Sequence, residues 1–399
     1  MRPLANRVQL LSGEGALSVF TRARRLEAEG RDIVHLELGE PDFHPDGTVV
    51  DAAKSALEAG RDRYTPPLGL PELREAIASY LRLTRSLSVS ADNVVTAPGC
   101  KMILSLVATS LIEPGDQVLY PDPGFPIYPS LIRALGGVPV AYGLHEANGF
   151  QPDPEEIEAA ITPSTKLLIT NFPNNPTGTV PTDEIQERLA AVILANDLWL
   201  IADEIYARII YDRSYTSLAT LPGMQERTAV VDGFSKTFAM TGWRLGYAVV
   251  PQALIGPLYM LISNTYTCAS EFIQLAGVAA LADCNEAAAK MVREFAKRRD
   301  QFIVGLNEIA GFRCLPPAGA FYAWVNVEQT GRSAEDIAEL LLEQAGVAGN
   351  AGGTFGKNGR NFLRFSFAAS AERLTEAVNR IHQVSSVWQR EATPQAANR

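Results

Sequence analysis

The sequence predicts an α/β protein whose main part is a doubly wound, mostly parallel sheet, accompanied by a smaller α+β region. Between about residues 90 and 250, short apolar runs of strand length alternate with longer amphipathic runs of helix length, as is typical of such a sheet. After about residue 284 this alternation ends in a long charged helical stretch. With 399 residues and 47% hydrophobic content, the chain can form two domains and bury a large core.

Each expected element follows from its own stretch of sequence. The expected strands of the α/β block are the apolar runs at 93–97, 116–120, 165–170, 198–204, 228–232 and 244–250. The expected helices between them are the amphipathic runs at 101–112, 125–136 and 183–197. Outside the block we expect a strand at 32–39, a charged helix at 286–309, a strand pair around 320–327, a further helix, a strand at 362–367 and a closing helix.

These elements predict a division into two domains. The large domain is expected at 47–283, and the small domain is expected to combine 1–46 with 284–388, because the early strand precedes the α/β block. The polar residues at 389–399 show no period and are expected to form a disordered tail.

Composition excludes several classes of function. The formal net charge is −10 and no basic block occurs, which disfavours contact with nucleic acid or an anionic membrane. No signal peptide or long apolar segment is visible, and the four cysteines form neither a C-x-x-C pair nor a disulfide framework, so we expect a cytoplasmic protein. The four histidines show no metal-binding spacing, so no metal is expected. P-loop, G-x-G-x-x-G and G-x-S-x-G motifs are also lacking.

The residues that follow the strands are more informative, because ligands of such sheets bind at the carboxyl ends of the strands. Asp203 ends a buried strand and needs a cationic partner, Tyr206 follows it, and Asn175 lies in the turn NNPTG. Lys236 lies at another strand end, where burial and Arg244 can lower its pKa; taken alone, it could also be a solvated loop lysine. A carboxylate, a phenol, an amide and an amine suit the ring of pyridoxal 5′-phosphate, with Asp203 at the ring nitrogen and Lys236 forming the Schiff base.

A phosphate site is expected beside this ring site. The segment APGCK opens a helix directly after a strand, so the backbone N–H groups of Gly99, Cys100 and Lys101 can face an anion. Ser235 and Arg244 can add a hydroxyl and a guanidinium.

With these residues in place, the chain resembles the class I and II aminotransferases of the aspartate aminotransferase superfamily, which are pyridoxal phosphate enzymes of fold type I. The resemblance rests on motifs in the family's order and spacing: GEPDF (39–43), YTPPLGLPELREAIA (64–78), PGFPIY (123–128), NFPNNPTG (171–178), ADEIY (202–206), SKTFAMTGWRLGY (235–247), PAGAFY (317–322) and FLRFSF (362–367). It implies a large domain with a seven-stranded, mostly parallel sheet between helices, and a small α+β domain.

The resemblance also implies roles for individual residues. Lys236 would form the Schiff base and then move protons, Asp203 would hold the ring nitrogen, and Asn175 and Tyr206 would bind the ring hydroxyl oxygen. Phe125 would stack on the ring, and Ser235, Arg244 and the Gly99–Lys101 loop would bind the phosphate. For the substrate, Arg364 would pair with the α-carboxylate, and Gly39 would lie in a loop that closes over it. Tyr64 would reach the phosphate of the partner subunit, which implies a homodimer.

Three features depart from the family pattern. Gly233 stands where the family often has a second serine, which leaves one hydroxyl fewer for the phosphate. The loop GNAGGTFG replaces a common Pro-Gly pair and is expected to alter the approach of Phe355 to the substrate. Cys100 and Lys101 replace the commoner Ala/Ser-Thr forms, which leaves the roles of their side chains open.

The leading hypothesis is a ping-pong transaminase acting on an L-amino acid and a 2-oxo acid. The alternative is a β-eliminating enzyme of the C–S lyase type, because this fold hosts both reactions on the same cofactor residues. A transcriptional regulator on this fold is disfavoured, since there is no room for a DNA-binding domain before residue 34. The substrate side chain stays open: Lys101 or Arg208 could bind a distal carboxylate, whereas Phe125, Tyr128, Tyr259 and Tyr266 could line an apolar site or simply pack.

Overall fold

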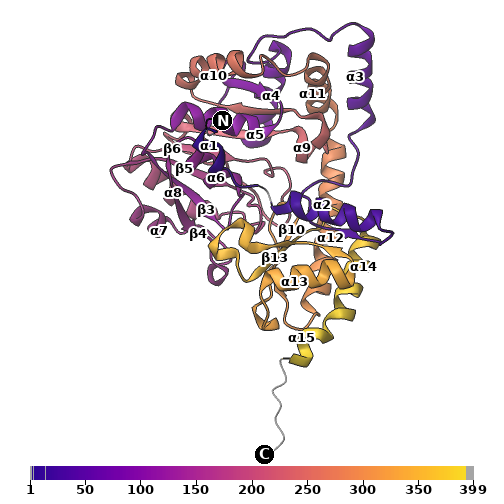
Figure 1. The fold of residues 1–399 in the computed structure, drawn as a ribbon. Coiled ribbons are helices and arrows are strands. Elements are labelled where there is room, and N and C mark those ends of the chain that lie inside the picture. Colours follow the sequence, from indigo (N-terminus) through magenta and orange to yellow (C-terminus); the bar gives the residue numbers. More distant parts are fainter. Residues whose placement is uncertain (1, 3, 14, 392–399) are drawn as a thin grey trace, which may run out of the picture.

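The computed structural model describes residues 2, 4–13 and 15–391, and its centre is a seven-stranded sheet (Figure 1). The strand order is β2-β8-β7-β6-β5-β3-β4. All neighbouring pairs from β7 to β4 are parallel, and β8 runs antiparallel to both β7 and β2. The strands span Val94–Ala97 (β2), Gln117–Asp122 (β3), Val138–Gly143 (β4), Thr165–Asn171 (β5), Trp199–Asp203 (β6), Thr228–Gly233 (β7) and Gly246–Val249 (β8). The predicted mostly parallel α/β sheet is confirmed.

Helices cover both faces of this sheet because its strands are apolar on both sides. In β6, for example, Ile201 packs with α5, α6 and α10, whereas Leu200 and Ala202 pack on the opposite face with α8. Helices α3, α4 and α11 cover the β2–β8–β7 end of that second face. The helices of this region are α3 (Gly47–Glu58), α4 (Pro71–Arg85), α5 (Cys100–Leu111), α6 (Ile127–Ala134), α7 (Pro154–Ala159), α8 (Asp183–Ala195), α9 (Phe234–Thr237), α10 (Gln252–Thr265) and α11 (Glu271–Asp283).

The C-terminal elements form a second layer beside the large sheet, and α2 lies across them (Figure 1). Their antiparallel sheet has the order β12-β13-β10-β9, and its core is rich in phenylalanine. The elements are β9 (Arg313–Cys314), β10 (Tyr322–Asn326), β12 (Asn350–Ala351), β13 (Phe362–Ser366), α12 (Asn285–Asn307), α13 (Ala334–Leu340), α14 (Ala371–Val384) and α15 (Ser386–Glu391). The expected strand pair around 320–327 is therefore the centre of a larger sheet.

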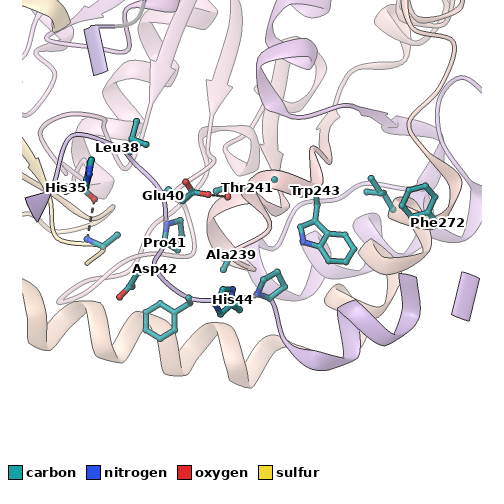
Figure 2. A pocket seen from close by; sticks show the side chains of 16 residues that line it. His35, Leu38, Glu40, Pro41, Asp42, His44, Ala239, Thr241, Trp243 and Phe272 are labelled. Carbon is teal, nitrogen blue, oxygen red and sulfur yellow. Dashed lines mark hydrogen bonds between the residues drawn. The ribbon is translucent and has the colours of Figure 1, made fainter. Parts of the chain in front are cut away.

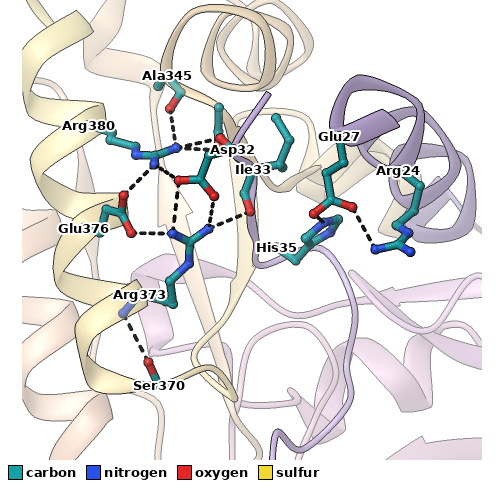
Figure 3. Close-up of polar contacts among 11 residues, drawn as sticks. Arg24, Glu27, Asp32, Ile33, His35, Ala345, Ser370, Arg373, Glu376 and Arg380 are labelled. Carbon is teal, nitrogen blue, oxygen red and sulfur yellow. Dashed lines mark hydrogen bonds and ion pairs between the residues drawn. The ribbon is translucent and has the colours of Figure 1, made fainter. Parts of the chain in front are cut away.

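The N-terminal segment joins this second layer. It contains α1 (Asn6–Gln9), α2 (Gly15–Ala28) and β1 (Val34–His35), and β1 pairs in parallel with β11 (Val347–Ala348). The strand expected at 32–39 is thus only two residues long. Asp32 strengthens the join, because its carboxylate lies between the guanidinium groups of Arg373 and Arg380 on α14 (Figure 3).

The pairing of β1 with β11 supports the predicted combination of the two ends of the chain in a small domain, and the boundaries at 46/47 and 283/284 stay a proposal. Helix α15 continues to Glu391, and the rest of the predicted tail, 392–399, lies outside the described residues. None of the described helices is both long and apolar enough to cross a membrane.

Candidate active site

A cavity of about 390 Å³ opens at the carboxyl ends of β5, β6 and β7, beside the start of α5 and the strands β10 and β13. It brings together most of the site residues predicted from the sequence. Those that line it are Gly39, Cys100, Lys101, Phe125, Asn175, Asp203, Tyr206, Ser235, Lys236, Arg244 and Arg364. Parallel strands end at the same edge of a sheet, which is why residues so far apart in the sequence meet here.

Asp203 is the last residue of β6, and its carboxylate is buried. Its Oδ2 accepts a hydrogen bond from the Tyr128 hydroxyl at 2.7 Å, and its Oδ1 accepts one from the Ile205 N–H at 3.3 Å. No lysine or arginine of the described residues forms an ion pair with it. Burial therefore raises the pKa of Asp203 to about 6, although the bond from Tyr128 opposes this rise. The carboxylate is suited to hold a positive charge that enters the cavity.

Lys236 lies in the short helix α9, directly after β7, and its half-buried side chain lines the cavity. Its Nζ donates a hydrogen bond to the carbonyl oxygen of Gly39. Burial is the main cause that lowers the pKa of Lys236 to about 8; the positive charges of Arg364 and Arg244 contribute less, and Cys100 and Glu40 oppose the shift. A fraction of this amine is uncharged near neutral pH and can act as a nucleophile or base.

Two tyrosines meet beside the lysine. The hydroxyl oxygens of Tyr206 and Tyr322 lie 2.6 Å apart, and their rings pack edge to face at 5.7 Å. Gly39 faces this pair: a Cβ at position 39 would lie 1.9 Å from the Tyr322 hydroxyl oxygen. Glycine is therefore required at position 39 for the tyrosine pair to keep its place.

Arg364 is buried in the middle of β13. It donates to Asn175 Oδ1 at 3.0 Å and to the carbonyl oxygen of Glu37. Its guanidinium carbon lies 4.5 Å from the ring centre of Tyr322 and 4.7 Å from that of Phe355. Two aromatic rings and two acceptors thus hold the guanidinium in one orientation, as a residue that binds a planar carboxylate requires.

The start of α5 has the geometry expected of an anion site. Gly99 is its N-cap with a φ of 90°, and a Cβ there would lie 2.4 Å from Nη2 of Arg244. The Arg244 guanidinium therefore packs directly on the glycine, beside the first N–H groups of the helix. Ser235 is buried in α9 and lines the same cavity.

Lys101 and Phe125 form another wall, with Lys101 Nζ 5.6 Å from the Phe125 ring centre. Of the other residues considered for the substrate side chain, Tyr128 holds Asp203, and Tyr266 donates to the Thr96 carbonyl at 3.0 Å outside the cavity. Arg208 lies 5.9 Å over the Tyr80 ring, outside the cavity, and Tyr259 is exposed on α10. The cavity therefore favours Lys101 over Arg208 as a second cation.

Tyr64 does not line the cavity of its own chain, and its side chain is 87% exposed. The exposure is compatible with a contact to a partner subunit.

A second cavity of about 680 Å³ is lined by residues 40–45 together with Trp243 and Phe272 (Figure 2). Glu40 lines both cavities and accepts a hydrogen bond from the Thr241 hydroxyl. This bond ties the segment that carries Gly39 to the loop that follows Lys236. No group of three or more His, Cys, Asp or Glu side chains in the described residues could hold a metal ion.

Tyr322, Glu37 and Asn171 were not predicted to belong to the site from the sequence. Asn171 accepts a hydrogen bond from the Asn175 N–H at 2.9 Å and donates to the Asp203 carbonyl at 3.0 Å, so it connects the ends of β5 and β6. Tyr322 stands within the PAGAFY motif, which was the only available signal.

Comparison with known proteins agrees with this geometry. The family model described as aminotransferase class I and II matches residues 31–381. The aspartate/prephenate aminotransferase of Thermus thermophilus is 38% identical over 96% of this chain and 99% of its own length. The aspartate aminotransferase of Pyrococcus horikoshii is 36% identical over 95% of this chain and 96% of its own length.

A solved structure of the aspartate aminotransferase from Thermus thermophilus with maleate superimposes with a TM-score of 0.92 at 37% identity, covering 96% of this chain and 100% of that one. Its fold confirms the predicted fold type I architecture. The chain belongs to the class I and II aminotransferases, and it is a transaminase.

Proposed function

We propose that this transaminase binds pyridoxal phosphate at Lys236 and transfers the amino group of L-aspartate, or of a related dicarboxylic amino acid, to a 2-oxo acid. The observation that carries the proposal is that a half-buried amine, a buried carboxylate and two cations line one cavity: Lys236, Asp203, Arg364 and Lys101.

The chemistry of the cavity fits the cofactor. Asp203 is a buried carboxylate without a cationic partner among the described residues, and a protonated ring nitrogen would supply that partner. The first turn of α5, Ser235 and Arg244 offer donors for a phosphate, and a side chain at Gly99 would displace the guanidinium.

The predicted assignments follow from this fit. Lys236 would hold the aldehyde carbon and Asp203 the ring nitrogen. Asn175 and Tyr206 would hold the ring hydroxyl oxygen, and Phe125 would cover the ring. The backbone of Gly99, Cys100 and Lys101 would bind the phosphate together with Ser235 and Arg244.

When bound, pyridoxal phosphate supplies an aldehyde that accepts the amino group and a ring that stores the electrons left by the Cα proton. Lys236 moves that proton at its Nζ, for which a pKa of about 8 is suitable near neutral pH. Arg364 orients the substrate through its α-carboxylate, and Asp203 holds positive charge at the base of the cavity.

The choice of a dicarboxylic substrate rests on the two cations. Arg364 is suited to one carboxylate, and Lys101, which lines the same cavity beside Phe125, could bind a second. The names of the Thermus and Pyrococcus relatives, and the maleate in the Thermus structure, support this choice.

We further propose a homodimer in the cytoplasm, in which Tyr64 of the partner subunit completes the phosphate site. The 87% exposure of Tyr64 supports a homodimer in which this side chain contacts the partner subunit, and the four free cysteines support a reducing, cytoplasmic location.

The proposal is tested with the visible absorption spectrum of the purified protein. Adding L-aspartate without an oxo acid should bleach the band of the bound cofactor, and an added 2-oxo acid should restore it. If the band persists while pyruvate or ammonia accumulates, the protein is a lyase. If Lys236→Ala turns over at the wild-type rate, the central assignment is wrong.

The substrate class is tested with Lys101→Ser, with Arg208→Ser as the matched control. We expect Lys101→Ser to lower kcat/KM for aspartate by only roughly tenfold, or about 1.4 kcal/mol, because this lysine is exposed. Activity with alanine, which has no distal carboxylate, should change little. A loss confined to Arg208→Ser would reverse the assignment.

A further inference from the structure

A buried ion triad lies behind the cavity, and its centre is Arg85 at the end of α4. Only 3% of its side chain is exposed. Its Nη1 donates to Glu204 at 2.7 Å, and its Nη2 donates to Asp232. Both carboxylates are buried as completely as the guanidinium.

The positions of these carboxylates connect Arg85 to the active site. Glu204 directly follows Asp203 at the end of β6, and Asp232 stands at the end of β7, four residues before Lys236. Strands β6 and β7 are parallel neighbours, with Asp203 opposite Val231, and the Glu204 N–H donates to the Val231 carbonyl at 2.8 Å. One guanidinium therefore binds both strand ends that carry the two central residues of the site.

The remaining donors hold the carboxylates in fixed orientations. Glu204 Oε1 accepts bonds from the hydroxyl groups of Tyr215, at 3.0 Å, and Ser217, at 2.5 Å. Asp232 Oδ2 accepts one from the Tyr247 hydroxyl at 2.9 Å, and its Oδ1 accepts one from the Gly233 N–H at 2.6 Å. The last bond orients the backbone at the point where the chain turns into α9.

Net stabilisation is a poor explanation for such a triad. Removing charges from water costs about as much as their attraction returns, so a buried ion network contributes little more than apolar residues of the same size. Apolar residues could not fix the geometry of two strand ends. Arg85 does so through Glu204 and Asp232, and it also places a positive charge beside these two carboxylates, which lie close to Asp203.

We propose that Arg85 is a positioning residue which, by binding Glu204 and Asp232 at once, sets the geometry of Asp203 and Lys236. The inference rests on the proposed function, because it assumes that these two residues hold the cofactor. Without Arg85, two buried carboxylates would repel each other at adjacent strand ends. Their separation would move Asp203 and Lys236 away from the arrangement that binds the cofactor.

The test compares Arg85→Met with Arg299→Met in the full-length protein. Arg299 on α12 is the control, because its buried guanidinium also pairs with two carboxylates, those of Asp212 and Asp300, which are exposed, and because it does not line the cavity. Three quantities are measured below the unfolding temperature: the Kd for pyridoxal phosphate, the pH midpoint of the bound cofactor's absorbance, and the fraction of Lys236 labelled by borohydride reduction in the peptide mass spectrum.

Both variants should unfold at lower temperature than the wild type. Arg85→Met leaves the buried carboxylates of Glu204 and Asp232 without their cation, and Arg299→Met removes a buried guanidinium from its bonds to Asp212, Asp300 and the Pro317 carbonyl. Only Arg85→Met should weaken cofactor binding, by roughly 10- to 100-fold, the range seen when residues that orient ligands of a site are removed. It should also shift the pH midpoint and lower the labelling of Lys236. If Arg85→Met and Arg299→Met give the same Kd and midpoint, Arg85 acts on stability alone and the proposal is wrong.

If Arg85→Met does not fold, Arg85→Lys and Asp232→Asn replace it, with Arg299→Lys as the control. A lysine keeps the charge but lacks the fork that reaches two carboxylates, so Arg85→Lys should weaken binding by less than the methionine variant, yet measurably. Unchanged cofactor binding in both replacements would overturn the proposal. If the wild type itself is not labelled at Lys236, the proposed function fails. If the wild type is labelled and Arg85→Met is labelled to the same extent, the proposed role of Arg85 fails and the proposed function stands.

Discussion

Asp203→Asn should make the cofactor-free protein more stable while it impairs the holoenzyme. Burial raises the pKa of Asp203 from an ordinary value of 3.8 to about 6. Each pKa unit corresponds to about 1.4 kcal/mol, so the ionised carboxylate costs the folded, cofactor-free protein about 3 kcal/mol at pH 8. The pKa of Asp203 is higher in the folded protein than in the unfolded chain. The ionised carboxylate therefore costs no stability below about pH 4, where the group is protonated in both states, and the full cost is reached as the pH rises through about 6.

Asparagine removes this cost at some loss of hydrogen bonding. Its single carbonyl oxygen can accept the bond from Tyr128, but the weak bond from the Ile205 N–H at 3.3 Å loses its acceptor, at a cost of about 1 kcal/mol. The net gain at pH 8 is therefore about 2 kcal/mol. For 399 residues the unfolding entropy is about 0.8 kcal/mol/K, so Tm should rise by about 2 °C.

The assay is calorimetry of cofactor-free wild type and variant at pH 8 and pH 5. At pH 5 the carboxyl group is largely protonated in the folded state, so the cost falls to about half and the Tm gain to under about 1 °C. Asp32→Asn is the control. Its partners Arg373 and Arg380 hold the pKa of Asp32 at about 2, so its effect should be a loss of stability that is the same at both pH values (Figure 3).

With saturating pyridoxal phosphate the order should reverse, because the cofactor would stabilise the wild type through the charge on Asp203 and the variant would lack that pairing. Two results would refute the reasoning: a lower Tm for cofactor-free Asp203→Asn at pH 8, or a Tm difference that does not depend on pH.

The remaining predictions concern Arg364, the N-terminal segment and the glycine beside the tyrosine pair. Arg364→Lys should lower kcat/KM by roughly 30- to 100-fold, about 2–3 kcal/mol, because a lysine lacks the fork; a loss under threefold in steady-state kinetics would contradict this. Glu37, and more weakly Glu27, raise the pKa of His35, so the stability that His35 contributes is present below its unfolded pKa and lost as the pH rises through the folded value. The Tm deficit of His35→Gln should therefore be larger at pH 6 than at pH 9, and an equal deficit would argue against the charged pair. Gly39→Ala should reduce activity because its methyl group would displace the Tyr322 hydroxyl, whereas Gly242→Ala, with open space around it, should not; equal activities would show that Tyr322 can move freely.

The large sheet was predictable because its strands are apolar on both faces and alternate with helices, and that pattern survives in the sequence. Once the strands were located, the residues at their carboxyl ends could be read from the sequence, and Asp203, Asn175 and Lys236 do share one cavity. The antiparallel direction of β8 was not predictable, since an apolar run carries no sign of its direction. Strands of two residues, such as β9 and β12, are too short to show a period.

Contacts between distant segments escaped the sequence analysis for another reason. Arg85 stands at the end of an amphipathic helix, where a cation is expected to face solvent and the carbonyl groups of the last turn. Tyr322 opens a strand that looks like ordinary core. In both cases the function depends on a partner more than a hundred residues away, Asp232 for Arg85 and Tyr206 for Tyr322, and neither pattern nor propensity identifies such a partner.

Two departures from the family pattern, which looked independent in the sequence, are one arrangement in space. A Cβ at Gly233, where the family often has a serine, would lie 2.7 Å from the Cys100 sulfur and 2.9 Å from the Gly246 Cα. The thiol fills that space and donates to the Asp232 carbonyl at 3.1 Å. The hydroxyl missing at position 233 is therefore excluded by its surroundings, and the cysteine holds the strand end whose carboxylate binds Arg85. The Cys100 thiol therefore contacts the strand end that leads to Lys236.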